Sequence, residues 1–164
     1  MITNVSFTTK EKDLLEDQKN HEQICILKYS NYANLACDQE LKDIFNGNKK
    51  QEVEHINTIN QLLSGQVPSM NNQQGESSSQ QSGSSKKQQS SSSNSETKFK
   101  SSDKELCSDI LMTEKFVSSA YNTAIFEFRE PAVRNVLNHI QKEEQQHGEA
   151  VYKYMESKGM YNAQ

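Results

Sequence analysis

The sequence predicts an all-α protein, an antiparallel four-helix bundle made of two copies of one helical hairpin. Apolar residues recur at three- and four-residue steps in four segments, which is the pattern of a helix with one buried face. A shift of 92 residues superposes residues 11–64 on residues 103–156 without a gap, and nine aligned positions are identical. Since average residue usage gives only about three identities, the chain is predicted to be a duplicated hairpin.

The composition is compatible with one domain and excludes several classes of protein. The chain has 164 residues, a net charge of −4, only 32% hydrophobic residues and no tryptophan. The shortage of apolar residues is concentrated in residues 65–102, so the rest of the chain can still bury a bundle-sized core. No basic stripe with interleaved aromatic residues is present, and we therefore expect no nucleic-acid partner.

The sequence carries no sign of export or membrane insertion. Its beginning has no cationic segment followed by an apolar run, and no stretch approaches the roughly 18 apolar residues of a membrane span. We therefore expect synthesis in the cytoplasm without a signal peptide, and no membrane partner. Cys25, Cys37 and Cys107 have no paired spacing and are interpreted as free thiols, the first and last on core faces and Cys37 in a turn.

Three segments follow from these patterns. Residues 8–64 form the first predicted hairpin, residues 103–161 form the second, and the two pack together as one bundle domain. Residues 65–102 between them are rich in serine, glutamine and asparagine. Such a segment cannot bury enough apolar area to offset the entropy of ordering, so a disordered linker is predicted. A glutamine-rich assembly segment is the alternative for this tract.

The first hairpin is predicted to contain two helices joined near Cys37. Asp38, directly after the break, is a suitable N-cap for the second helix, and Gly65 stands where a C-terminal glycine stops it. Residues 46–48, Asn-Gly-Asn, resemble a turn. The apolar periodicity nevertheless continues through them without a phase shift. One continuous helix is therefore predicted, at a cost of about 1 kcal/mol for the glycine.

The second hairpin repeats this arrangement. Its first helix is predicted from an apolar stripe that starts at Leu106 and ends at Phe128. Pro131 fits the first turn of the next helix, whose stripe runs to Met155, and Gly159 closes it.

The same set of metal-binding side chains occurs once in each hairpin. Glu22 precedes Glu52 by 30 residues, Glu114 precedes Glu144 by 30 residues, and a histidine follows the second glutamate of each pair by three residues. Each glutamate lies about 15 residues, or roughly 22 Å, from its predicted turn, so the members of a pair lie level on antiparallel helices. If the hairpins pack face to face, six side chains meet in the middle of the bundle: Glu22, Glu52, His55, Glu114, Glu144 and His147.

This convergence predicts two divalent metal ions. Four buried carboxylates without cations would repel one another and lose their hydration at a large cost, whereas two divalent ions neutralise them. Carboxylate oxygens with one imidazole per metal suit iron or manganese, and two of the carboxylates are expected to bridge the metals. The alternative is a set of carboxylates that are protonated, paired or displaced toward solvent.

Several neighbouring residues are given weaker roles. Tyr29 and Tyr121 lie two turns after the first glutamate of each hairpin, and they are the candidates for a catalytic role. They are expected either to pack in the core or to act on the centre, through a hydrogen bond to a ligand carboxylate or as redox-active phenols. His21 and His139 are expected at the surface, and Glu54 and Glu143, although next to ligands, are expected to be solvated.

The fourth helix resembles a known family. Residues 133–161, VRNVLNHIQKEEQQHGEAVYKYMESKGMY, are similar to the C-terminal half of the spore coat F family of endospore-forming bacteria, and the helix start EPAVR at 130–134 is similar too. The resemblance extends over about 103–161, and residues 8–64 match more loosely as a second copy. It implies a ferritin-like bundle, a location in the spore coat, and other coat proteins or a second copy of the chain as partners.

The ferritin-like pattern also carries over residue by residue. Glu22 and Glu114 stand for its single glutamates, the two Glu-x-x-His pairs stand for the paired ligands, and Tyr29 is similar to a tyrosine of bacterial ferritins. The spacing of 30 residues is a few residues shorter than in that pattern, and the crossover is a polar tract.

Three functional hypotheses remain open. The first is a coat protein with a dinuclear iron or manganese site. The second is a di-metal oxidoreductase of catalase or peroxidase type that acts on peroxide. The third is a ferritin-type iron store, which would need a closed shell that no sequence feature indicates.

Overall fold

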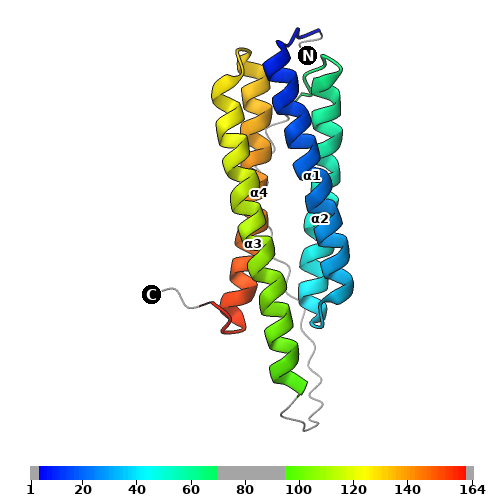
Figure 1. Ribbon diagram of the computed structural model, residues 1–164, viewed down its shortest axis with the longest axis vertical. Helices are drawn as coiled ribbons and strands as arrows, with labels where there is room; N and C mark the ends of the chain where they lie inside the picture. Colours follow the sequence, from blue (N-terminus) through cyan, green and yellow to red (C-terminus); the bar gives the residue numbers. More distant parts are fainter. Residues whose placement is uncertain (1–3, 70–94, 162–164) are drawn as a thin grey trace.

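The computed structural model describes residues 4–69 and 95–161 as four long helices in one bundle (Figure 1). The helices are α1 (Thr9–Leu35), α2 (Gln39–Leu63), α3 (Ser95–Glu127) and α4 (Pro131–Ser157). The predicted all-α four-helix bundle of two hairpins is confirmed.

The two hairpins, α1–α2 and α3–α4, pack against each other through α1 on α3 and through α2 on α4. The turn of the first hairpin lies at one end of the bundle and that of the second at the other, and α2 ends at the end opposite to the start of α3 (Figure 1). Each long helix therefore presents its middle to the same level of the bundle, where the candidate ligands lie.

The borders of the predicted linker are different in the structure. Val67 is buried in the core, and α3 begins at Ser95, within the segment predicted as linker. Residues 70–94, which hold most of that segment, lie outside the described residues, so its predicted disorder stays a prediction.

The helices begin at capping residues. Thr8 and Glu11 form a reciprocal capping box at the start of α1, and the side chain of Asp38 caps α2 as predicted. Pro131 occupies the first turn of α4 after the N-cap Glu130. These caps accept the backbone N–H groups that the first turn of a helix leaves without a partner.

Glycine ends α2 and α4 in the same way. Gly65 and Gly159 have positive φ angles of 84° and 65°. In both cases the glycine N–H and the N–H of the next residue bond back to the last turn of the helix, which is a Schellman motif. Gly47, by contrast, lies inside α2, so the prediction of one continuous helix through residues 46–48 is confirmed.

Two buried acids join the hairpins at their ends. Glu11 of α1 accepts hydrogen bonds from the backbone N–H (3.0 Å) and the guanidinium of Arg129, in the turn of the second hairpin. Asp103 of α3 accepts bonds from the backbone N–H groups of Cys37 (2.9 Å) and Asp38 (3.1 Å), in the turn of the first hairpin. An acidic side chain of each hairpin thus accepts hydrogen bonds from the backbone of the turn in the other hairpin.

The core consists of the predicted stripes. Cys25 and Cys107 are buried free thiols, and Cys37 is partly exposed in the α1–α2 turn. The largest fully buried apolar or aromatic side chains are Tyr29, Tyr121, Phe45, Leu15, Leu41, Ile59, Leu62, Ile110, Leu137 and Ile140.

The Glu11 contact predicts a pH-dependent loss of stability on mutation. Burial acts to raise the pKa of Glu11, but hydrogen bonds from Arg129 and Thr8 outweigh it and lower the pKa from 4.5 to about 2. This stabilisation is therefore complete above pH 4.5 and disappears as the pH falls toward 2. Glu11→Gln should lower the free energy of unfolding at pH 7 by about 1–3 kcal/mol, measured by urea denaturation, and the difference from the parent should narrow below pH 4.5.

The matched control is Glu127→Gln. Glu127 pairs with Lys10 at 2.6 Å, but both side chains are largely exposed, so its loss should cost less than about 1 kcal/mol. Equal destabilisation by both substitutions, or a Glu11→Gln effect that does not change with pH, would contradict the role of Glu11.

Candidate metal centre

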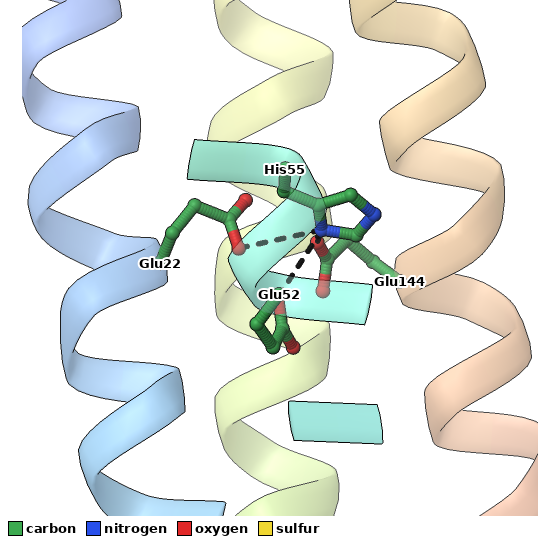
Figure 2. A group of neighbouring side chains, drawn as sticks. All are labelled: Glu22, Glu52, His55 and Glu144. Atoms are coloured by element: carbon green, nitrogen blue, oxygen red, sulfur yellow. Dashed lines mark hydrogen bonds and ion pairs between the residues drawn. The ribbon is translucent and has the colours of Figure 1, made fainter. Parts of the chain in front are cut away.

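The six predicted ligands meet at the middle of the bundle. Each helix contributes at mid-length: Glu22 from α1, Glu52 and His55 from α2, Glu114 from α3, and Glu144 and His147 from α4. All six have an exposed fraction of 4% or less. Figure 2 shows four of them, Glu22, Glu52, His55 and Glu144, pointing toward one another.

The first of two groups surrounds the Nδ1 atom of His55. This nitrogen lies 2.9 Å from Glu144 Oε1, 3.1 Å from Glu52 Oε2 and 3.4 Å from Glu22 Oε2. Three helices therefore bring carboxylate oxygens to one imidazole nitrogen, as Figure 2 shows.

The second group surrounds the Nδ1 atom of His147. This nitrogen lies 3.1 Å from Glu52 Oε1, 3.6 Å from Glu144 Oε2 and 3.9 Å from Glu114 Oε1. Glu52 and Glu144 thus belong to both groups, and each directs one oxygen to His55 and the other to His147. Within each group, one atom per residue can be chosen so that all lie within 4.8 Å of one another.

The donor atoms fit metal ions better than a network of hydrogen bonds. A neutral imidazole has one N–H, so His55 Nδ1 can donate to only one of the three oxygens around it. Four buried carboxylate oxygens of the cluster have no hydrogen-bond partner: Glu22 Oε2, Glu114 Oε2 and both oxygens of Glu144. Buried carboxylate oxygens without partners are costly, and a cation at each group would satisfy them together.

The electrostatics of the cluster lead to the same conclusion. Burial and the neighbouring carboxylates raise the pKa of Glu114 to about 11 and also raise the pKa of Glu22. Burial alone would lower the pKa of His147, but Glu144 and Glu52 raise it to about 9. Burial would likewise raise the pKa of Glu144, but its bonds from His147 and His55 lower it. Without metal, protons on glutamates and histidines must supply the missing positive charge.

Two tyrosines bind the carboxylates that are not shared. The hydroxyl of Tyr29 donates to Glu114, and the hydroxyl of Tyr121 donates to Glu22, so each tyrosine bonds to the opposite hairpin. Asn48 in turn donates to the Tyr29 oxygen at 3.1 Å. Burial and the adjacent glutamate raise the pKa of both phenols, which therefore keep their protons and act as donors.

One residue of the cluster does not follow the sequence expectation. Glu143 was expected to be solvated, but its Oε2 lies 2.9 Å from His55 Nε2, and its Oε1 accepts from Gln51 at 2.6 Å. His139 lies 3.3 Å from the same carboxylate. A carboxylate behind a ligand histidine fixes the ring and raises its basicity. The helical period alone placed Glu143 off the ligand stripe and could not show that α2 comes close to it.

Only one of the two ligand histidines has a carboxylate next to its Nε2 atom. His147 Nε2 is buried without a hydrogen-bond partner. The residue of the first hairpin that corresponds to Glu143 is Gln51, which bonds to Glu143 itself. The two halves of the centre are therefore chemically unequal.

A groove reaches the centre from the second hairpin. It has a volume of about 660 Å³ and lies between α3 and α4. Its lining includes the ligands Glu114 and Glu144, and Gly148 of α4.

The remaining sequence candidates lie outside the cluster. His139 and Glu54 are exposed. His21 is partly buried, and its ring packs edge-on against Phe116 with 5.3 Å between the ring centroids. Among the described residues, the only groups of acidic, histidine or cysteine side chains with metal-binding geometry are the two described above.

The comparisons with known proteins identify the second hairpin. No curated protein and no solved structure matches the chain. In the described ranges, none of the helices is both long and apolar enough to cross a membrane. A family model, that of the Coat F domain, matches residues 102–164 and does not extend to α1 and α2. The part of the chain that is similar to the Coat F domain thus comprises most of α3 and all of α4.

Proposed function

We propose that this protein is a spore coat protein whose bundle holds a dinuclear iron or manganese centre. The Coat F domain supports the location in the coat. The observation that carries the metal site is the arrangement of Glu52 and Glu144, each with one oxygen near His55 Nδ1 and the other near His147 Nδ1. A carboxylate placed between two donor groups in this way is suited to bridge two metals.

In this proposal the ligands divide into two equal sets. Glu22 and His55 would hold one metal, Glu114 and His147 would hold the other, and Glu52 and Glu144 would contribute to both. Four carboxylates neutralise two divalent ions, and oxygen-rich sites with one imidazole per metal favour iron or manganese. The same ligand set, on four helices joined by one long crossover, characterises ferritin-like carboxylate proteins.

The residues around the ligands have supporting roles. Tyr29 and Tyr121 donate hydrogen bonds that hold the terminal carboxylates Glu114 and Glu22 in place. Glu143 orients His55 with its Nδ1 atom directed to the metal. All six ligand side chains are buried, so their contact with bulk water is small.

A second candidate function is peroxide chemistry of catalase or peroxidase type at the same centre. The observation that favours it is the groove that reaches Glu114 and Glu144. When bound, such a metal pair supplies two redox-active ions with open coordination positions. The tyrosine hydroxyls beside the terminal ligands place two protons at the centre. A location in the coat and this activity are compatible.

Removal of a ligand histidine should weaken metal binding. His55→Ala or His147→Ala should lower the affinity of one of the two metals by more than about 10-fold, since even the loss of an outer partner costs that much. The helical circular dichroism should be unchanged. Metal analysis of protein purified without oxygen, together with titration of iron(II) or manganese(II), measures both stoichiometry and affinity.

His21→Ala is the control for this experiment, because His21 belongs to neither ligand group and its ring packs against Phe116. It should keep two metals per chain. Parent protein that binds neither iron nor manganese, or ligand variants that keep full metal content, would refute the proposed centre.

Glu143 should matter at only one of the two metals. Glu143→Gln removes the negative charge behind His55 and should weaken one binding step by about 10- to 100-fold. Glu54→Gln, which alters an exposed glutamate of α2, should leave both steps unchanged. If the two variants gave equal metal-binding isotherms in a competition titration, Glu143 would have no effect on metal binding by His55.

The location in the coat predicts where the protein accumulates. A fluorescent fusion expressed during sporulation of an endospore-forming host should form a shell around the forespore. Replacement of residues 102–164, the Coat F domain, by an unrelated helical hairpin should abolish that shell. Uniform fluorescence of the intact fusion throughout the mother cell would contradict the assignment.

A further inference from the structure

We propose that the groove between α3 and α4 is the binding and entry site for hydrogen peroxide, which reaches the centre on its Glu114–His147 side. This inference rests on the proposed dinuclear centre and assigns its substrate and its open face. It depends on three observations: the gap at Gly148, the different residues at the matching positions of the first hairpin, and the neutral hydrogen-bonding side chains in the lining.

Gly148 opens the groove directly above a ligand. It lies one position after His147, and a Cβ atom at this position would stand 3.6 Å from Leu111 Cδ1 and 3.9 Å from Glu114 Cβ. These are ordinary contact distances, so the position tolerates a small side chain. A larger one would extend into the groove that Glu114 and Gly148 line.

The first hairpin has bulky apolar residues at the matching positions. The internal repeat aligns Gly148 with Ile56, Ser118 with Ile26, and Gln145 with Val53. Three small or polar residues that line the groove thus correspond to three branched aliphatic residues in the other half. The duplicated hairpins share their ligands but differ at the face beside them, which indicates that only the second face is adapted for access.

The lining of the groove selects a small neutral molecule. Apart from the two ligands, its charged residues are Lys115 and Glu149, one of each sign. The other polar groups are neutral hydrogen-bonding side chains such as Ser118, Asn122 and Gln145. Hydrogen peroxide is uncharged and both donates and accepts hydrogen bonds, so these side chains can bind it, and the balanced charges give no preference for an anion.

The groove ends at the His147 group, whose histidine has no hydrogen-bond partner behind it. Glu114 and Glu144 line it, and Glu114 belongs to the His147 group. His147 Nε2 has no hydrogen-bond partner, whereas His55 Nε2 is held by Glu143. His55 is therefore held in position by Glu143, whereas a molecule that enters through the groove meets the ligand group around His147.

The reaction balances with two metal ions. Hydrogen peroxide takes up two electrons and two protons, its O–O bond breaks, and two water molecules leave. Two divalent ions held by the six ligands would supply the two electrons, and two protons from the solvent would complete the two water molecules.

The test is a comparison of two glycine substitutions in full-length, metal-loaded protein. Gly148→Leu fills the groove, and Gly47→Leu places the same side chain inside α2, where a Cβ atom meets nothing within 4 Å. Both substitutions replace a helical glycine by leucine, so their effects on helix stability should be similar. The protein loaded with iron(II) under anaerobic conditions is mixed with hydrogen peroxide, and the rise of iron(III) absorption is followed by stopped flow. Gly148→Leu should react at least 10-fold more slowly than the parent, and Gly47→Leu should match the parent.

A second readout does not depend on turnover. With manganese(II) bound, the longitudinal relaxation of water protons reports exchange of water at the metals, and Gly148→Leu should reduce this enhancement at least 2-fold per bound ion. Gly148→Ala, which makes only ordinary contacts, should stay close to the parent in both measurements.

The outcomes separate the two proposals. If Gly148→Leu keeps two metals, reacts at the parental rate and keeps the parental relaxation, the groove is not the entry site and the metal centre stands. If the parent binds no metal, the proposed centre fails, and the entry site fails with it.

Discussion

The burial of four carboxylates around two imidazoles is the constraint on which the rest of this structure depends. Glu22, Glu52, Glu114 and Glu144 lie in the middle of a helical bundle with no exposed fraction above 2%. Charges in such a place must be compensated, and the surroundings are arranged for that purpose. Two imidazole nitrogens face the carboxylates and two buried hydroxyls donate to them. The cost of this arrangement is the reason why we interpret the cluster as a metal centre rather than as part of the core.

The contacts that complete the cluster run between the hairpins. Tyr29 of the first hairpin bonds to Glu114 of the second, and Tyr121 of the second bonds to Glu22 of the first. The ends of the bundle repeat this exchange, because Glu11 holds the backbone at Arg129 and Asp103 holds the backbone at Cys37. Neither hairpin can therefore build the centre alone. The segment that matches the Coat F model contains three of the six proposed ligands, and α1 and α2 contain the other three.

The two halves have kept their ligands and changed the residues around them. Glu143 lies behind His55, whereas the matching position in the first hairpin is Gln51. Asn48 donates to Tyr29, whereas the matching residue of the second hairpin is Ile140, which has no side-chain hydrogen-bonding group. Gly148 leaves one face open where Ile56 stands in the other half. In the proposed centre, such differences would make the metal position at His55 the more firmly held one and the metal position at His147 the more accessible one.

The sequence by itself determined the helices, the turns and the ligand set. A period of 3.6 residues can be read from local spacing, and the repeat placed Glu22, Glu52, Glu114 and Glu144 at one level of the bundle. Only the tertiary structure decided which carboxylates are shared, which glutamate each tyrosine holds, and that Glu143 supports His55. These contacts join residues more than 80 positions apart. The rotation of one hairpin against the other, which decides such contacts, depends on the packing of all four helices and leaves no local pattern in the chain.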